Sequence, residues 1–448
     1  MKNAMLRLCG TLFCCLLAAP GWALNVPASP VRMDGQELAR ALNQRLASTP
    51  VRCLDGQPDY ACSGVLVRPM AEKHLTQFWL HDAEAITHGG ERFDYLRQDV
   101  SLAPDDQRTG YVMMSSFAAA AAGRPYSVKA RPGPAEVLVS NWDHARPLTA
   151  AIEALYYTVA KPKALLRAQR GQLAWFRATG QWLPVLRFEP GNVAGAFGYD
   201  TRDQLYYGYE VMERVTGRYG DTSATCPDGS AAFNCNGVLL RTTDVGNFHA
   251  WDPSPNSLAR NGVSFSFLRT DTRVSTTYKV QGFIVRPQAY PVTQPMALRC
   301  VYPHDAHTGA LADMCTSRPS CASLNITTAQ AWKSNYQGNS ISSCYFSPNP
   351  VEFQLSNAIR GAGGFSPDYG WNELMMAAWR PGTGAGLPLE AFIYGGVTAR
   401  PGQGLPGAQA FQLDYYQTTQ RYLPILRVQP GAPVAQVFSY NPDDQQVD

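Results

Sequence analysis

Two segments of this 448-residue chain carry apolar residues at every fourth position. This spacing places the apolar side chains on one face of an α-helix, so each segment predicts an amphipathic helix. Asp34 and Glu37, at the start of the first segment, have the spacing of a capping box, which would begin the helix near Asp34. The apolar positions are Leu38, Leu42 and Leu46 in the first segment and Val211, Val215 and Tyr219 in the second.

Short runs of valine, leucine and aromatic residues follow each predicted helix, and glycine and proline separate these runs. Runs of this kind are typical of β-strands joined by turns. One helix followed by several strands in each half predicts an α+β fold with short mixed or antiparallel sheets.

The two halves of the chain also share individual positions, which indicates a tandem duplication. In each half, two cysteines nine positions apart precede an apolar strand that ends in Arg68 or Arg241. A second strand ends in Arg97 or Arg269. Further matches, in the same order, are Trp79 with Trp251, Asp99 with Asp271, Glu136 with Glu373, Glu153 with Glu390, the pairs Trp175-Phe176 and Tyr415-Tyr416, and the closing segments Leu183–Arg187 and Leu423–Arg427.

The first 23 residues have the pattern of a secretory signal peptide. Lys2 and Arg7 supply the basic start, Leu8–Ala19 is a short apolar run, and Gly21-Trp22-Ala23 provides a cleavage site. The apolar run is shorter than the roughly 20 residues that a membrane-spanning helix needs. We therefore expect a secreted or periplasmic protein without stable membrane insertion. Its parts would be the signal peptide at 1–23, a first repeat at 24–203 and a second repeat at 204–448.

Cysteine usage agrees with export. The chain has 11 cysteines, and the eight outside the signal peptide form an even set, as expected for disulfides in an oxidising compartment. The duplicated spacing pairs Cys53 with Cys62 and Cys226 with Cys235. Four others occupy an insertion in the second repeat, and their spacing leaves all three possible pairings open. These four are Cys300, Cys315, Cys321 and Cys344.

Charge and motifs exclude several classes of function. The formal net charge is only +3 and no basic run occurs, so no nucleic-acid partner is expected. The chain has no C-x-x-C pair and no histidines at ligand spacing, so no metal site is expected. No nucleophile elbow or Walker pattern supports a lipase, protease or NTPase.

Polar residues on three strands of the second repeat suit cleavage of the N-glycosidic bond of NAD. Arg241 ends one strand, Ser264 and Ser266 share one side of the next, and Glu373 begins a later one. An arginine fork can hold the pyrophosphate or the ribose. A carboxylate can stabilise the oxocarbenium-like transition state as nicotinamide leaves. We therefore predict that these four residues line one cleft and carry catalysis.

Three further residues are assigned to binding of NAD as substrate. Phe265 and Phe267 alternate with the two serines and could flank the nicotinamide ring, and His249 lies close to Trp251 in the chain. For a lone histidine beside a tryptophan, a structural role is the alternative. No separate cofactor is expected.

The first repeat differs at the serine positions, where it has Arg92 and Asp94. We therefore expect the second repeat to be the catalytic one and the first to be a degenerate copy that supports or targets it.

The segments that carry this pattern resemble the halovibrin family of secreted bacterial proteins. They are Asn236-GVLLRTT, His249-AWDPSP, Gly262-VSFSFLRTD and Asn372-Glu373-Leu374 with Ala378-Trp379, and the resemblance covers essentially the whole second repeat. Halovibrins are described as ADP-ribosyltransferase-like NAD glycohydrolases. The resemblance implies a tandem of ADP-ribosyltransferase-like modules in which Arg241, Ser264, Ser266 and Glu373 fill the arginine, serine and glutamate positions of the active site.

Two positions depart from or complicate that pattern. Trp371 stands where transferases that modify arginine carry a second glutamate or glutamine, which favours water over a protein side chain as acceptor. Glu390 is present in both copies and competes with Glu373 for the catalytic role.

Three functions are compatible with the sequence. The first is a secreted NAD glycohydrolase, with transfer of ADP-ribose to an unknown protein acceptor as a variant. The second is a non-catalytic exported protein that binds a glycan or a host or envelope protein. The third is a toxin with nuclease or hydrolase chemistry around His249. The serine pair in only one copy favours the first, because a binding tandem would more naturally keep both sites.

Overall fold

The structure of the chain is a computed structural model. The predicted signal peptide at 1–23 and Trp79 lie outside the residues that it describes. The described residues are 31–53, 59, 62–70, 91–99, 109–114, 127–133, 136–140, 152–158, 163–179, 182–243, 249–274, 280–286, 296–304, 313, 315–335, 344–362, 370–395 and 403–446.

The described part of the first half forms one sheet of eight strands, in the order β4-β5-β2-β1-β3-β6-β7-β8. Neighbouring strands are antiparallel except β6 and β7, which are parallel. A parallel pair needs a long crossover, and helix α3 supplies it. The elements are α1 (Val31–Ala47), β1 (Val65–Met70), β2 (Glu91–Leu96), β3 (Thr109–Met114), β4 (Ser127–Gly133), β5 (Glu136–Ser140), β6 (Ala154–Thr158), α3 (Ala164–Thr179), β7 (Val185–Phe188), β8 (Phe197–Gly198) and the 3₁₀ turn η3 (Thr201–Asp203).

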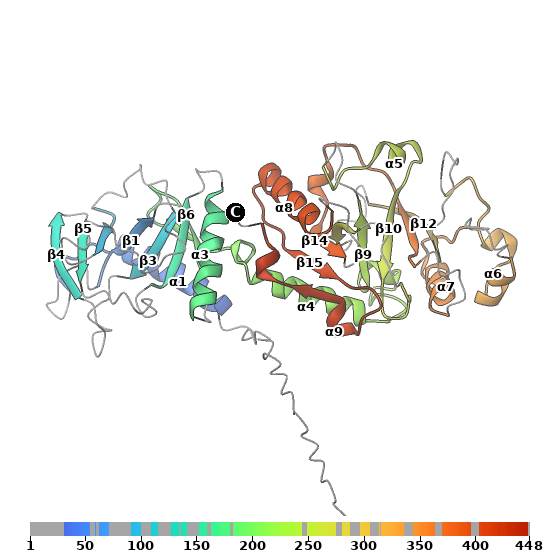
Figure 1. Ribbon diagram of the computed structural model, residues 1–448, viewed down its shortest axis with the longest axis horizontal. Coiled ribbons are helices and arrows are strands. Elements are labelled where there is room, and N and C mark those ends of the chain that lie inside the picture. Colours follow the sequence, from blue (N-terminus) through green and yellow to red (C-terminus); the bar gives the residue numbers. More distant parts are fainter. Residues whose placement is uncertain are drawn as a thin grey trace, which may run out of the picture.

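The second half repeats this topology, with the order β12-β13-β10-β9-β11-β14-β15-β16 and a parallel pair β14–β15 around helix α8 (Figure 1). The α+β class is therefore confirmed, and the two sheets match strand for strand. The elements are α4 (Tyr207–Gly220), β9 (Val238–Thr242), α5 (Pro255–Ala259), β10 (Val263–Leu268), β11 (Gln281–Val285), β12 (Leu298–Tyr302), α6 (Ala329–Asn335), α7 (Pro350–Gly361), β13 (Glu373–Met376), β14 (Leu389–Gly395), α8 (Leu405–Thr419), β15 (Ile425–Val428), α9 (Val434–Val437), β16 (Phe438–Tyr440) and η8 (Pro442–Asp444).

Helices cover both faces of each sheet. In the second half, Leu239 and its neighbours pack under α8, while Val238 and Leu240 pack under α4. The first half has the same arrangement, with α3 on one face and α1 on the other. Because successive side chains of a strand point to opposite faces, each strand contributes to two separate cores.

The predicted helical stripes are confirmed. Leu42, Leu46, Val211 and Val215 are fully buried against the sheets. Helix α1 begins at Val31 and not near Asp34, so the predicted capping box is not formed and Asp34 lies within the first turn.

The duplication extends to buried polar side chains. Gln172 of α3 donates to the side-chain oxygen of Gln204 at 3.1 Å, and Gln412 of α8 donates to that of Gln445 at 3.2 Å. All four are buried, and a buried amide must find hydrogen-bond partners. Each pair ties the crossover helix to the end of its half.

The strand-end arginines hold the start of each half together. Arg97 forms a two-bonded pair with Asp99, and Arg269 forms the same pair with Asp271. Arg97 also bonds Asp59 at 2.9 Å, and Arg269 bonds the Ser223 backbone oxygen at 2.9 Å. Both arginines are buried, and their hydrogen bonds hold neighbouring segments of the same half together.

The two halves meet through aromatic residues of their crossover helices. Phe176 stacks on Trp182 with ring centroids 4.1 Å apart, and Tyr416 and Tyr422 of the second half belong to the same buried cluster. Within the second half, Gly208 permits close packing of α4, because a β-carbon there would overlap the Tyr440 ring.

Four disulfides are present among the described cysteines. Cys53–Cys62 and Cys226–Cys235 confirm the predicted pairs. The insertion is closed by Cys300–Cys315 and Cys321–Cys344, a choice that spacing alone left open.

Removing the Cys226–Cys235 bond by the double change Cys226→Ser and Cys235→Ser should lower the free energy of unfolding by about 2–3 kcal/mol, because the bond closes a short loop. The matched control is Cys53→Ser with Cys62→Ser, whose sequence separation of 9 is the same. Urea unfolding without reductant measures both. Unchanged stability in both variants would contradict the account.

Candidate functional site

Ser266 and Glu373 lie opposite each other on the adjacent antiparallel strands β10 and β13. Phe265 pairs with Leu374, so the same register places Ser266 across from Glu373. On the next strand, Tyr302 of β12 pairs with Glu373. Residues opposite each other point to the same face. The structure therefore brings Ser266, Glu373 and Tyr302 into one row across three strands.

The two serines differ in exposure. Ser264 is exposed, whereas Ser266 is 9% exposed and donates to the backbone oxygen of Asn372 at 3.3 Å. The Asn372 side chain bonds both backbone groups of Phe267, at 2.8 and 2.9 Å. These bonds extend the contact between β10 and β13 to the residue before Glu373. They therefore fix the position of the Glu373 backbone.

Glu373 is 6% exposed and lies near other ionisable side chains. Burial raises the pKa of Tyr302 above its ordinary range, and the negative charge of Glu373 raises it further, while Arg318 acts to lower it. The Cys300–Cys315 bond joins β12 to the segment that carries Arg318. A carboxylate, a phenol and a guanidinium therefore act on one another at this edge of the sheet.

Arg241 lies on the other face of the sheet. It lies two positions after Leu239 on β9 and therefore shares the α8 face with it, and its guanidinium carbon lies 5.8 Å from the centre of the Trp379 ring. Met375, which shares the face of Glu373, belongs to a different buried cluster. The expectation that Arg241, Ser264, Ser266 and Glu373 line one cleft is therefore corrected, because strand alternation sends Arg241 to the opposite side.

Burial dominates the environment of Arg241. It lowers the pKa of Arg241 to about 10, and the negative charge of Asp252 offsets part of this effect. Its Nη1 atom has no hydrogen-bond partner among the described residues. The Asp252 carboxylate itself accepts from the backbone of Gly382 at 3.0 Å and of Gly384 at 3.3 Å.

Phe265 and Phe267 are core residues. They are 1% and 0% exposed, and they pack edge-to-face on Phe283 at 6.1 Å and on Phe353 at 5.3 Å. The expected role of these two rings as flanks of a nicotinamide is corrected, because neither reaches solvent from this position.

His249 belongs to a surface group on the Arg241 side. Its ring stacks on Trp251 with centroids 4.9 Å apart, and its Nδ1 atom lies 2.7 Å from an Asp414 oxygen. Trp379 donates to the Trp251 backbone oxygen at 3.0 Å, which connects His249 to the Arg241 neighbourhood. A carboxylate that orients a histidine is part of general-base chemistry. No described hydroxyl or thiol bonds the other ring nitrogen.

Asp414 was not found from the sequence. It lies 165 residues from His249 in the chain and sits on α8, so only the packed fold reveals the pair.

Glu390, the competing carboxylate, is engaged in the fold. Arg214 bonds it at 2.6 Å, and Arg218 bonds it through two nitrogen atoms, one at 3.1 Å. These arginines lie on α4, so the pair joins that helix to β14. The first half has the equivalent pair, in which Glu153 acts on Arg45.

The described helices include none that is long and apolar enough to cross a membrane. Within the same residues, no group of three or more His, Cys, Asp or Glu side chains could hold a metal ion.

Comparisons with protein-family models, curated proteins and solved structures gave no match to this chain.

Glu390→Gln should lower the free energy of unfolding at pH 7 by about 3 kcal/mol, because it leaves two arginines without their carboxylate. Burial acts to raise the pKa of Glu390, but the bonds from Arg218 and Arg214 outweigh it and hold this pKa below its ordinary value. The stabilisation is therefore present above the unfolded pKa, about 4.3, and is lost as the pH falls through the lower folded value.

Urea unfolding at pH 7 and pH 3 measures this effect. The control is Glu189→Gln, whose half-exposed pair with Arg187 should contribute less than about 1 kcal/mol. Wild-type stability in Glu390→Gln would refute the clamp.

Proposed function

We propose that this chain is a secreted enzyme that cleaves the bond between nicotinamide and ribose in NAD, and that the second half carries the catalysis. The observation that carries the proposal is the row of Ser266 and Glu373 on adjacent strands, with a carboxylate that is only 6% exposed. The resemblance to halovibrins supports the same substrate and the same glutamate. The four disulfides are compatible with an exported protein.

Cleavage of this bond is favoured by one negative charge beside the ribose. The C–N bond between ribose and nicotinamide breaks, its electron pair goes to the ring nitrogen, and nicotinamide leaves uncharged. Positive charge develops on the ribose, and the Glu373 carboxylate stabilises it. Water then adds to the ribose carbon and releases a proton, which gives ADP-ribose. A buried carboxylate is effective here because a low dielectric strengthens its attraction for developing charge.

Arg241 has no part in this proposal, because it lies on the α8 face. Trp371, two positions before Glu373, favours water as the acceptor over a protein side chain. We therefore propose hydrolysis as the main reaction, with ADP-ribosyl transfer as a variant.

A second candidate is a non-catalytic exported binding protein. One observation favours it: the predicted site residues are divided between the two faces of the sheet, and Phe265 and Phe267 are core residues. In this case the exposed surface of His249 and Asp414 would serve recognition of a glycan or a protein.

Glu373→Gln keeps the shape of the side chain and removes its charge, so it should lower nicotinamide release from NAD by a factor of about 10²–10³ if that charge supplies 3–4 kcal/mol. The purified mature protein is incubated with NAD, and released nicotinamide is quantified by chromatography.

The matched control is Glu136→Gln. Glu136 pairs with Asp94 in the first half, the register position that Glu373 has opposite Ser266. It should leave turnover within about twofold of wild type, a difference worth less than 1 kcal/mol. Full activity in Glu373→Gln would rule out its catalytic role. No nicotinamide release by the wild-type protein would favour the binding protein.

A further inference from the structure

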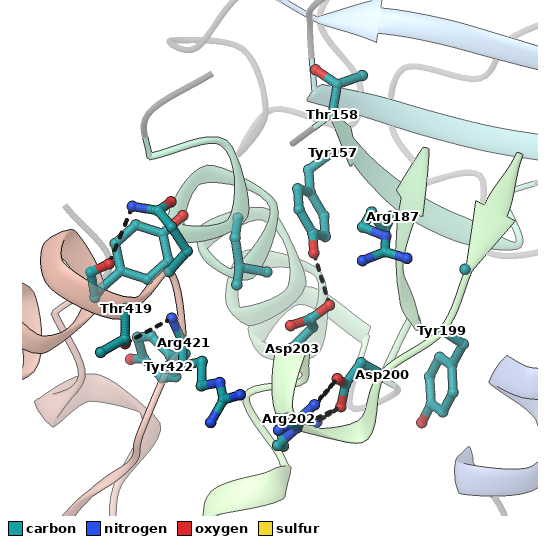
Figure 2. A pocket seen from close by; sticks show the side chains of 14 residues that line it. Tyr157, Thr158, Arg187, Tyr199, Asp200, Arg202, Asp203, Thr419, Arg421 and Tyr422 are labelled. Carbon is teal, nitrogen blue, oxygen red and sulfur yellow. Dashed lines mark hydrogen bonds and ion pairs between the residues drawn. The ribbon is translucent and has the colours of Figure 1, made fainter. Parts of the chain in front are cut away.

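A cavity of about 390 Å³ lies between the two halves, apart from the Glu373 row. The first half contributes β6, β7, β8 and η3, and the second contributes the end of α8 with the residues that follow it (Figure 2). A volume of this size suits a small-molecule ligand, and junctions between domains are frequent positions for such sites.

Three arginines from three segments line this cavity. Arg187 lies on β7, Arg202 on η3, and Arg421 follows α8. Figure 2 shows Arg421 reaching from the second half toward Arg202. Arg202 is paired with Asp200 at 2.6 Å and Arg187 with Glu189 at 3.1 Å, whereas the Arg421 side chain forms no ion pair with any described residue. Among these three arginines, Arg421 is therefore the one whose guanidinium can bind an anionic ligand.

The duplication supplies an internal comparison for this charge. Tyr157 donates to Asp203 at 2.8 Å, and Tyr394 donates to Asp444 at 2.6 Å. These two bonds identify the corner of the second half that is equivalent to the cavity side of the first half. In the repeat pattern of the sequence, Arg187 corresponds to Arg427, Arg202 to Asp443, and Arg421 to Gln181 of the first half. Two of the three arginines are therefore specific to the cavity. Because the repeat does not require them, they indicate a function of this corner.

Other groups of the cavity suit a ligand that also has a ring. Tyr157, Tyr416 and Tyr422 form walls that are largely buried. Thr158 lines the cavity as well, and its buried hydroxyl has no hydrogen-bond partner among the described residues. The second half has Gly395 at the position of Thr158. Tyrosine walls and hydroxyl groups next to arginines are suited to a ring that carries an anionic group.

We infer that this cavity binds a phosphate monoester of nucleotide size, with Arg421 on the phosphate and the tyrosines against the ring. Arginine matches phosphate through two parallel hydrogen bonds. The inference does not depend on NAD cleavage, because binding is measured without turnover.

Asp203 provides an independent check on the charge. Burial raises the pKa of Asp203 to about 6, and the bond from Tyr157 partly opposes this rise. The charged and titratable groups that face it are Tyr157, Arg187, Asp200, Arg202 and Tyr416. At pH 7.5 its carboxylate repels a bound phosphate. Asp203→Asn should therefore tighten binding about fivefold, since Asn keeps an oxygen for Tyr157 and loses the charge.

Isothermal titration calorimetry of the mature full chain with AMP, at pH 7.5 and low salt, tests the inference. The wild-type protein should bind AMP, and adenosine should bind at least about tenfold more weakly, because it lacks the phosphate. Arg421→Gln should weaken AMP binding by about ten- to a hundredfold, the loss expected for a charged hydrogen-bond donor. Arg421 is exposed, so its replacement should leave the unfolding midpoint unchanged.

The matched control is Arg427→Gln, at the position that corresponds to Arg187 in the second half. It should bind AMP like the wild type. Equal affinity for AMP and adenosine, unchanged affinity in Arg421→Gln, or an equal loss in Arg427→Gln would overturn the inference. Because Glu373 is intact in every variant, nicotinamide release reports separately on the proposed enzyme.

Discussion

The organisation of this protein depends on one geometric constraint, the alternation of side chains along strands that are buried on both faces. Each sheet lies between two layers of helices, so its central strands supply two cores at once. A polar residue on such a strand must find partners on whichever face its position dictates. This constraint places Glu373 with Tyr302 and Arg241 with Trp379, although the two strands that carry them are separated only by β10.

The same constraint explains how shared and unshared residues differ. Several residues present in both halves form closed interactions, such as the arginine–aspartate pair after β2 and β10 and the glutamine pairs near the end of each half. Glu390 is a shared residue of this kind, held by Arg214 and Arg218. Two of the positions that differ between the halves belong to the proposed sites. One is the Ser266 position opposite Glu373, and the other is the Arg421 position in the cavity.

Much of the fold could be predicted from the sequence, because it depends on local patterns. Four-residue spacing predicted the buried stripe of α4, and duplicated cysteines predicted two disulfides. The alternation of serine and phenylalanine on β10 correctly separated two faces. It could not reveal that helices cover both of them, and Phe265 was therefore expected at a surface.

The remaining features depend on contacts between distant segments. The His249–Asp414 pair, the pairing within the insertion and the cavity between the halves each join residues that no local pattern connects. That Arg241 and Glu373 lie on opposite faces follows from the register of three strands, which cannot be deduced from the sequence alone.

We propose that NAD is cleaved on the Glu373 face of the second sheet and not on the Arg241 face. A crystal structure of the mature protein with a non-hydrolysable NAD analogue tests it most directly. We expect the nicotinamide ribose to lie beside the Glu373 carboxylate, within reach of the strand that carries Ser264 and Ser266. An analogue whose ribose lies against Arg241 and Trp379, on the α8 face, would contradict it.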